Sequence, residues 1–281
     1  MRLEVVHRTQ YHYTAAVQDS FNELRMRPVD NEHQRCERSL LRVVPSVRLK
    51  HYVDLHSNHV SFFELNEPHV SLELDCRSVV LTQSLPMPAN PSFPMARVSE
   101  CARMERCHEY LQPSTYVDPS PEAWRLALDA SHAEEDLWGA AIAIMKLVFR
   151  EFRYEPGATH VKTHVNDVLS DRRGVCQDFA HVMLAMCRAR SIPALYVSGY
   201  LYNGPSELLR GTQASHAWCE VFVPGVGWRG LDPTNDQPAD ERYVKVAVGR
   251  DYADVAPVQG TYRGGAGQSL SVEVEVRRIE S

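Results

Sequence analysis

Four prolines stand within nine residues near the end of the first third of the chain: Pro86, Pro88, Pro91 and Pro94. Proline fixes its backbone φ angle and has no N–H to donate, so this run can form neither a helix nor a central strand. A proline-rich segment of this kind acts as a stiff spacer between folded units. We therefore predict a linker over residues 86–98, which separates an N-terminal domain (1–85) from a second domain (99–281).

The residues before the linker alternate between apolar and polar side chains, as in strands with one buried face. The clearest stretch covers residues 47–55, where an apolar residue or a histidine occupies every second position. Several short strands at regular spacing predict a β-sandwich-like N-terminal domain. The expected strands cover residues 3–7, 40–45, 47–55, 60–65, 70–74 and 79–81.

The pattern changes after the linker, where helical periodicity comes first and strand alternation follows. Pro113, Pro119 and Pro121 are expected to break the chain before the first long helix. Helices followed by an antiparallel sheet indicate an α+β fold, and we assign the C-terminal strands to the same domain as the helices. The expected helices cover residues 99–111, 133–149, 165–169 (ended by Gly174) and 176–190, and the expected strands cover 194–201, 217–223, 228–231, 243–248 and 270–276.

Composition limits the function classes. Apolar residues make up 44% of the 281 residues and charged residues 23%, which is typical of a soluble globular protein. The net charge of −6 is mild and spread along the chain, so we expect no nucleic-acid partner. No run approaches the ~20 apolar residues of a membrane span, and the N-terminus lacks the apolar core of a signal peptide. We therefore expect a cytoplasmic protein with no membrane partner.

The seven cysteines are odd in number and lack CxxC spacing, so free thiols are the simpler account.

One of these cysteines, Cys176, stands at the expected start of a helix. Apolar residues follow it at spacings of three, four, seven and eleven, which is one helix face. The unpaired N–H groups and the dipole at a helix N-terminus favour the thiolate, the reactive form of cysteine. A lone cysteine is more often an inert core residue, so its position alone does not identify a catalytic group.

A base and an acid for this thiol stand further along the chain. His216 opens an expected strand and Asp232 closes the next, with a turn at residues 224–227 between them. A nucleophilic thiol needs a base, and the imidazole needs a third group to fix its orientation. With a symmetric two-residue loop, Asp232 would oppose Cys219 and point away from the face of His216. We therefore predict an odd-membered loop, a bulge or a twist in this hairpin.

Three motifs make the chain resemble the transglutaminase-like superfamily of papain-fold cysteine enzymes: Gly174-Val175-Cys176, His216-Ala217-Trp218 and Leu231-Asp232-Pro233-Thr234. The fuller string at residues 174–181 is similar to the bacterial branch. The first third of the chain, with Asn22-Glu23-Leu24-Arg25, looks like the β-rich N-terminal region of that branch. The resemblance implies an acyl-enzyme, in which Cys176 attacks a carboxamide or peptide carbonyl, His216 acts as base and then acid, and Asp232 orients His216. The Cys176 N–H is a natural oxyanion donor, whereas no side-chain donor is assigned.

Neighbouring residues favour structural roles. His181 lies about 140° around the helix from Cys176 and is expected to pack. Gln177 points about 100° away and has no assigned role, and Asp178 suits a helix cap. For Trp218 three readings stay open: it shields the histidine and aspartate, it lines the acyl site, or it packs in the core.

The sequence favours hydrolysis of a peptide or amide bond by a cysteine peptidase or amidase, with a peptide, protein or amide as substrate. Protein-glutamine cross-linking and a non-catalytic scaffold are the alternatives. No metal or cofactor is expected, because His160 and His164 have the i, i+4 spacing of a metal pair but no evident third ligand. Specificity is expected from the loop 202–213, which carries Glu207 and Arg210. The oligomeric state is left open.

Overall fold

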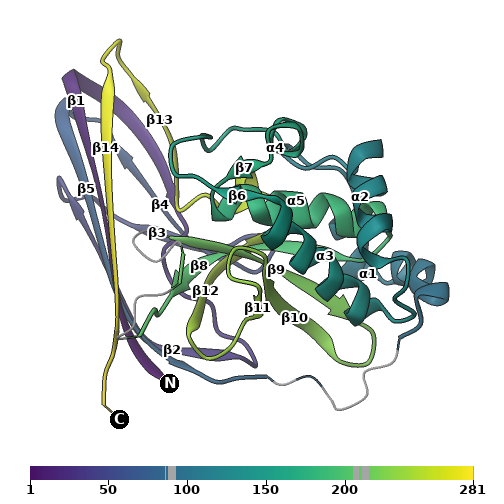
Figure 1. The fold of residues 1–281 in the computed structure, drawn as a ribbon. Helices are drawn as coiled ribbons and strands as arrows, with labels where there is room; N and C mark the ends of the chain where they lie inside the picture. Colours follow the sequence, from purple (N-terminus) through teal and green to yellow (C-terminus); the bar gives the residue numbers. More distant parts are fainter. Residues whose placement is uncertain (86, 88–92, 205–208, 211–214, 281) are drawn as a thin grey trace.

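The computed structural model describes residues 1–85, 87, 93–204, 209, 210 and 215–280, and it contains two packed parts (Figure 1). A curled antiparallel sheet forms the N-terminal part, and helices on a second antiparallel sheet form the other. The predicted α+β class with an N-terminal β part is confirmed. Pro86 and residues 88–92 of the expected linker lie outside the described residues, as do 205–208 (with Glu207) and 211–213 of the expected specificity loop. Phe93 of the expected linker packs in the core of the second part, and residues 95–98 begin a 3₁₀ helix, so a linker can be predicted only for the residues before Phe93.

The N-terminal sheet is organised around one long strand, β1 (Arg2–Leu24), which has partners on both edges. Its register with its neighbour shifts between His12 and Val17, so the strand bends there and the sheet curls. The other strands of the sheet are β2 (Gln34–Val44), β3 (Lys50–Val53), β4 (His59–Leu65), β5 (His69–Thr82), β13 (Val258–Arg263) and β14 (Gln268–Arg278).

The last two strands, β13 and β14, belong to this N-terminal sheet. The first half of β1 pairs with β5 and β14, and its second half pairs with β4 and β13. β14 runs antiparallel to β1 without a break, from Leu3 opposite Arg278 to Tyr13 opposite Gln268. This pairing corrects the assignment of the last predicted strand, residues 270–276, to the second domain, whereas the predicted strand 243–248 does lie in the second sheet. Alternation indicates which side chains share a face, but it does not identify the partner strand.

Two predicted strands differ in extent. Residues 47–55 alternate strictly, but only Lys50–Val53 form a strand, β3, and all four of its side chains are exposed at the edge of the sheet. Residues 70–74 and 79–81, predicted as separate strands, join in β5, which has many buried side chains. Alternation therefore indicates where strands lie but not how deeply their side chains are buried.

The second part is a five-stranded antiparallel sheet with helices on one face (Figure 1). Its central helix, α5 (Cys176–Ala189), packs on the sheet and has 13 of its 14 residues buried. A helix that is buried all round belongs to the middle of a core. The strand order is β11 (Gln237–Pro238), β10 (Gly227–Asp232), β9 (His216–Val223), β8 (Ala194–Leu201) and β12 (Tyr243–Gly249).

Further helices and short strands surround this core. α2 (Pro121–Ser131) and α3 (Leu137–Glu151) pack against α5. No helix in the described ranges is long and apolar enough to cross a membrane. The remaining elements are two 3₁₀ helices (Met95–Arg103 and Glu109–Leu111), α1 (Glu105–His108), β6 (Arg153–Tyr154), α4 (Val165–Asp171), β7 (Arg173–Gly174) and α6 (Tyr252–Val255).

Helix ends differ from the prediction at a proline and a glycine. Pro121 is the first residue of α2, where its missing N–H is not needed, and the Ser120 hydroxyl caps the helix. α4 ends at Asp171 and not at Gly174, and its C-cap Arg172 adopts the left-handed conformation with φ 54°. The predicted helix over 99–111 is instead divided between 3₁₀ turns and α1.

The two parts share side-chain amide contacts as well as an apolar core. Gln34 pairs with both the N–H and the C=O of Lys245 at 2.7 Å, and Asn58 pairs with both groups of Val248 at 2.8 Å. These amides stand where a neighbouring strand would bond to the outer edge of β12. The shared apolar core joins Leu3, Val5, Val80 and Val274 to Tyr200, Val244 and Val246.

Candidate active site

Cys176 is the first residue of α5, as the sequence predicts. The Asp178 carboxylate accepts hydrogen bonds from the Val175 N–H at 2.7 Å and from the Thr159 hydroxyl at 2.5 Å. Asp178 therefore caps the helix that carries the thiol. Gly174 leaves room for this cap, because a Cβ at position 174 would stand 2.5 Å from an Asp178 carboxylate oxygen.

β9 and β10 form the hairpin that carries His216 and Asp232. Val223 pairs with Gly227, so the connecting loop has three residues, 224–226. The register continues to Leu231 opposite Cys219, which puts Asp232 opposite position 218 and in phase with His216. The predicted odd-membered loop is confirmed.

His216 and Asp232 form a hydrogen-bonded pair with no solvent exposure of either side chain. The distance from His216 Nε2 to Asp232 Oδ2 is 2.8 Å. Burial lowers the pKa of His216, but the charge and hydrogen bond of Asp232 outweigh burial and raise that pKa to about 10. Burial raises the pKa of Asp232, yet the charge of His216 and several hydrogen bonds hold it below its ordinary value. Both shifts in pKa favour the charged forms of the pair, imidazolium and carboxylate.

Three further donors hold the Asp232 carboxylate, and the sequence predicted none of them. Oδ2 accepts from the Asn235 side-chain amide and from the Tyr243 hydroxyl, and Oδ1 accepts from the Thr234 N–H, each at 2.8 Å. Asn235 follows the aspartate by three residues in a turn, a local signal that could have indicated it. Tyr243 comes from β12 at the far edge of the sheet, and no local pattern indicates its approach.

Cys176 and His216 line one cavity of about 910 Å³. Nδ1 of His216, the ring nitrogen that Asp232 leaves free, has no hydrogen-bond partner among the described residues. The thiol lies close enough to the ring to raise the pKa of His216 further. The free ring nitrogen is therefore available to Cys176. The other walls include Gln177, four tyrosines (Tyr154, Tyr196, Tyr202 and Tyr252) and three residues of β14 (Val274, Glu275 and Val276).

Tyr154 is a wall residue that the sequence did not single out. β6 pairs it with Gly174 of β7, which brings its ring beside the segment that leads into Cys176. Burial, and after it the charge of Cys176, raise the pKa of Tyr154 to about 12, so the phenol keeps its proton. The Arg210 guanidinium lies 5.8 Å from the centre of this ring and 5.3 Å from that of Phe149.

His181 and Gln177 lie near Cys176 on α5 and make different contacts. His181 is fully buried, its Nε2 accepts from the Tyr252 N–H at 3.2 Å, and burial lowers its pKa to about 3. These contacts agree with a packing role. Gln177 lines the cavity and donates through Nε2 to the Val161 carbonyl at 3.1 Å.

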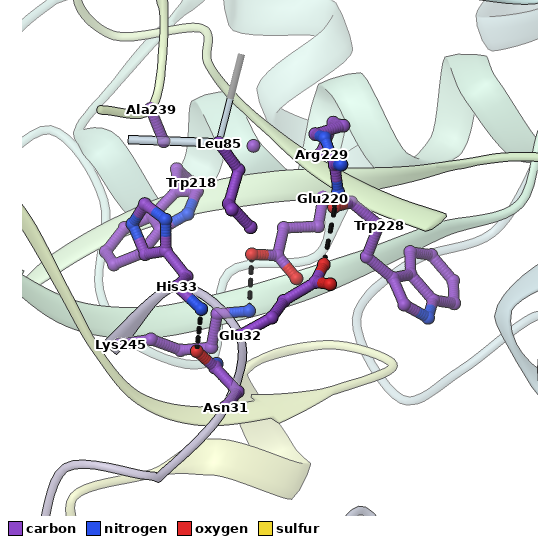
Figure 2. A pocket seen from close by; sticks show the side chains of 11 residues that line it. Asn31, Glu32, His33, Leu85, Trp218, Glu220, Trp228, Arg229, Ala239 and Lys245 are labelled. Atoms are coloured by element: carbon purple, nitrogen blue, oxygen red, sulfur yellow. Dashed lines mark hydrogen bonds and ion pairs between the residues drawn. The ribbon is translucent and has the colours of Figure 1, made fainter. Parts of the chain in front are cut away.

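Trp218 covers the imidazole of the pair, with ring centroids 6.1 Å apart. Its other surroundings are a second cavity of about 250 Å³, shown in Figure 2. The charges in that cavity are already paired, Lys245 with Glu220 at 2.5 Å and Arg229 with Glu32 at 3.2 Å. The cavity of the thiol does not include Trp218, which argues against the reading in which it lines the acyl site. Trp218 is buried in a core cluster with Tyr243, so both shielding of the pair and core packing agree with its position.

His160 and His164 make local backbone contacts. Their Nδ1 atoms accept from the N–H groups of Lys162 and Asn166, at 3.2 and 3.3 Å, and His164 caps α4. Among the residues with described positions, no three His, Cys, Asp or Glu side chains gather as a metal site would require. All seven cysteines are unpaired.

Two family models match this chain. Residues 125–233 match the transglutaminase-like superfamily, and residues 3–81 match the bacterial transglutaminase-like N-terminal region. A crystal structure of a candidate cysteine protease from Cytophaga hutchinsonii has the same fold, with a TM-score of 0.78 and 23% identity over 100% of this chain and 92% of that one.

Similar curated proteins include an uncharacterized protein of Mycobacterium leprae, 36% identical over 99% of both chains. A protein-glutamine gamma-glutamyltransferase of Pseudomonas aeruginosa is 33% identical over 47% of this chain, which is 20% of that protein. These similarities support thiol-dependent catalysis in broad terms. With a relative that matches along nearly its whole length and with both family regions present, this chain belongs to the transglutaminase-like superfamily.

Proposed function

We propose that the protein is a thiol-dependent acyl-transfer enzyme that hydrolyses a peptide or amide bond. Cys176, His216 and Asp232 are its catalytic residues in this proposal. One observation carries it: Cys176 and His216 line the same cavity, with one ring nitrogen of His216 free and the other held by Asp232 at 2.8 Å.

The first half of the reaction forms a thioester. The reaction starts from a thiolate and imidazolium pair, in which His216 already holds the proton of the Cys176 thiol, and the raised pKa of His216 favours this pair. The thiolate attacks the carbonyl carbon, and negative charge develops on the carbonyl oxygen. The Cys176 N–H and the dipole of α5 stabilise that charge. The C–N bond then breaks, and the imidazolium gives its proton to the leaving amine.

The second half releases the acid. A water molecule attacks the thioester carbonyl while neutral His216 takes a proton from the water. The C–S bond breaks, the carboxylic acid leaves, and the thiolate and imidazolium pair is restored. Asp232 stabilises the imidazolium in both halves. Tyr154 supplies a protonated phenol to the cavity wall. The pKa of this phenol is raised by burial and by the charge of Cys176.

Amine transfer to a glutamine side chain is the second candidate, supported by the similarity to the Pseudomonas aeruginosa protein over 47% of this chain. Transfer to an amine needs a site that holds the amine in competition with abundant water. Among the described residues that line the cavity, Glu275 is the one carboxylate, and Arg277 already pairs with it at 2.5 Å. Hydrolysis needs no such site, so we favour hydrolysis.

Alkylation tests the nucleophile. We expect iodoacetamide at pH 7 to modify Cys176 at least about tenfold faster than any other thiol, read by peptide mass mapping. Equal rates at Cys176 and at the half-buried Cys36 would contradict the proposal and favour the scaffold. The basis is that burial raises the pKa of each of the others: Cys36, Cys76, Cys101, Cys107, Cys187 and Cys219.

Product analysis separates the two reactions. Casein is incubated with the enzyme in the presence and absence of a fluorescent primary amine, with Cys176→Ala as the control. New peptide N-termini or ammonia without amine uptake support hydrolysis. Incorporation of the amine, lost in Cys176→Ala, supports cross-linking instead.

A further inference from the structure

We infer that the outer edge of β14 binds the substrate as an added strand, so that the substrate is a polypeptide segment in extended conformation. The inference rests on the proposed function, because it names the substrate class of the same cavity. Folded protein surfaces and small amides would not supply the backbone and side-chain contacts described below.

The edge of β14 forms part of the cavity wall. Val274, Glu275 and Val276 are consecutive, and all three line the cavity that contains Cys176 and His216. Successive side chains of a strand point to opposite faces of the sheet. Three consecutive residues can therefore line one cavity only where the strand edge, with its backbone, faces the cavity.

This edge is open in the described part of the chain. There β14 pairs with β1 alone, through eleven consecutive residue pairs without a register shift. Proteins usually blunt a free edge with a proline, a bulge, charged side chains or a cover. β14 contains no proline and no bulge, and its charged side chains Glu273, Glu275 and Arg277 alternate with the apolar residues of the strand. The outer edge of β12, by contrast, is covered by Gln34 and Asn58. The protein thus covers one edge and leaves open the one beside the thiol.

An apolar stripe continues from the cavity along the same strand. Leu270, Val272, Val274 and Val276 occupy alternate positions and share the inner face of the sheet. Val274 is 8% exposed because it packs on the core, whereas Val272 is 40% exposed and Leu270 55%. In Figure 1, β14 extends well beyond the level of α5. From Val274 to Leu270 the strand rises about 13 Å, enough for about four substrate residues.

Strand addition uses both features. Backbone hydrogen bonds to the open edge give affinity, and alternate side chains on the stripe give specificity. The expected substrate segment is therefore unfolded before it binds and carries apolar side chains at every second position. Its scissile or acyl-donor residue lies opposite residues 274–276, beside Cys176.

Binding of fluorescein-labelled casein, an unfolded polypeptide, to the Cys176→Ala protein tests the inference without any need for turnover. We expect Val272→Asp, on the stripe, to weaken binding by about tenfold, because a charge replaces an apolar contact. Ser271→Asp is the matched control, since it adds the same charge at the next residue but on the outer face, and it should change binding by less than about threefold. In the proteins that retain Cys176, both substitutions should leave the iodoacetamide rate of Cys176 unchanged.

Hydrogen exchange gives the second readout. Casein should slow the exchange of backbone amides in β14. Equal effects of the two aspartate substitutions, absent casein binding, or unchanged β14 exchange would each overturn the inference. The inference would also be overturned if sedimentation shows a dimer in which the amides of β14 exchange slowly without casein. The proposed function can fail separately. If Cys176 is alkylated slowly and no product forms, but casein binding still weakens in Val272→Asp, the proposed function is overturned and the binding edge is not.

Discussion

The Tyr243 hydroxyl donates to Asp232 Oδ2 at 2.8 Å, the same oxygen that holds Nε2 of His216. Tyr243 begins β12, whereas the histidine and the aspartate stand on the hairpin of β9 and β10. The bond therefore ties the candidate site to the strand on which the N-terminal part packs. Tyr243 does not line the cavity, so its contribution is to position the carboxylate.

Tyr243→Phe should lower kcat by about tenfold, the value of one hydrogen bond to a charged group. KM should stay unchanged, because the substrate does not touch this side chain. Tyr200→Phe is the control: it removes a buried hydrogen bond of 2.8 Å to His7 and leaves Asp232 untouched. A similar fall of kcat in both variants, measured with casein, would indicate a general loss of stability and not a positioning role.

Asp232→Asn should lower the pKa of His216 from about 10 to below 6.5, because burial then acts against a weaker opposing charge. The thiolate loses its stable imidazolium partner, so alkylation of Cys176 at pH 7 should slow. NMR titration of the His216 ring gives the pKa directly. Asp240→Asn, which removes a partly exposed carboxylate paired with Arg242, should change neither quantity.

The same pair makes stability depend on pH. The pKa of His216 is raised, so its contribution is complete below 6.5 and is lost as the pH rises toward about 10. The pKa of Asp232 is lowered, so its contribution is present above 3.8 and is lost as the pH falls. The difference in unfolding free energy between the wild type and Asp232→Asn should therefore be largest between pH 3.8 and pH 6.5. Urea unfolding at pH 5.5, 7.5 and 9.5 should show this difference shrinking with pH, and a constant difference would contradict the pairing.

Gly174→Ala should displace the Asp178 cap, because the new Cβ would stand 2.5 Å from a carboxylate oxygen of Asp178. We expect a loss of about 1–3 kcal/mol in unfolding free energy, together with slower alkylation of Cys176. Gly265→Ala is the control, since no other atom lies within 4 Å of a Cβ built there. Unchanged alkylation in Gly174→Ala would mean that the cap does not position the thiol.

Asn58→Leu should destabilise the contact between the two parts of the protein. The substitution leaves the partly buried N–H and C=O of Val248 without these partners, at a cost of up to about 1–3 kcal/mol for each group. Asn31→Leu is the control, because the Asn31 side chain likewise makes two hydrogen bonds to the backbone, accepting from the N–H groups of His33 and Gln34, but is exposed. Urea unfolding should show the larger loss for Asn58, and equal losses would contradict the role of Asn58 at β12.

Local patterns predicted those parts of the site that depend on local spacing. The helix start at Cys176 follows from helical periodicity. The period of two in a strand predicts an odd-membered loop, a bulge or a twist in the hairpin, and the structure has the first of these. Tyr243 and the β14 residues depend instead on pairing between distant strands, which no local pattern encodes. Gly174 is a third case. The sequence predicts that this glycine ends α4, but in the structure its lack of a side chain makes room for the Asp178 carboxylate.

Pairing between β1 and β14 joins opposite ends of the chain, with Leu3 beside Arg278. During synthesis, Cys176 and the hairpin of His216 and Asp232 emerge before β14 exists. The wall formed by Val274, Glu275 and Val276 can assemble only after that last strand has been made and has returned to β1. Such long-range pairing forms slowly compared with local structure. A growing chain therefore carries Cys176 for some time before the cavity is complete, and under the proposed function a substrate can bind only after β14 has been translated.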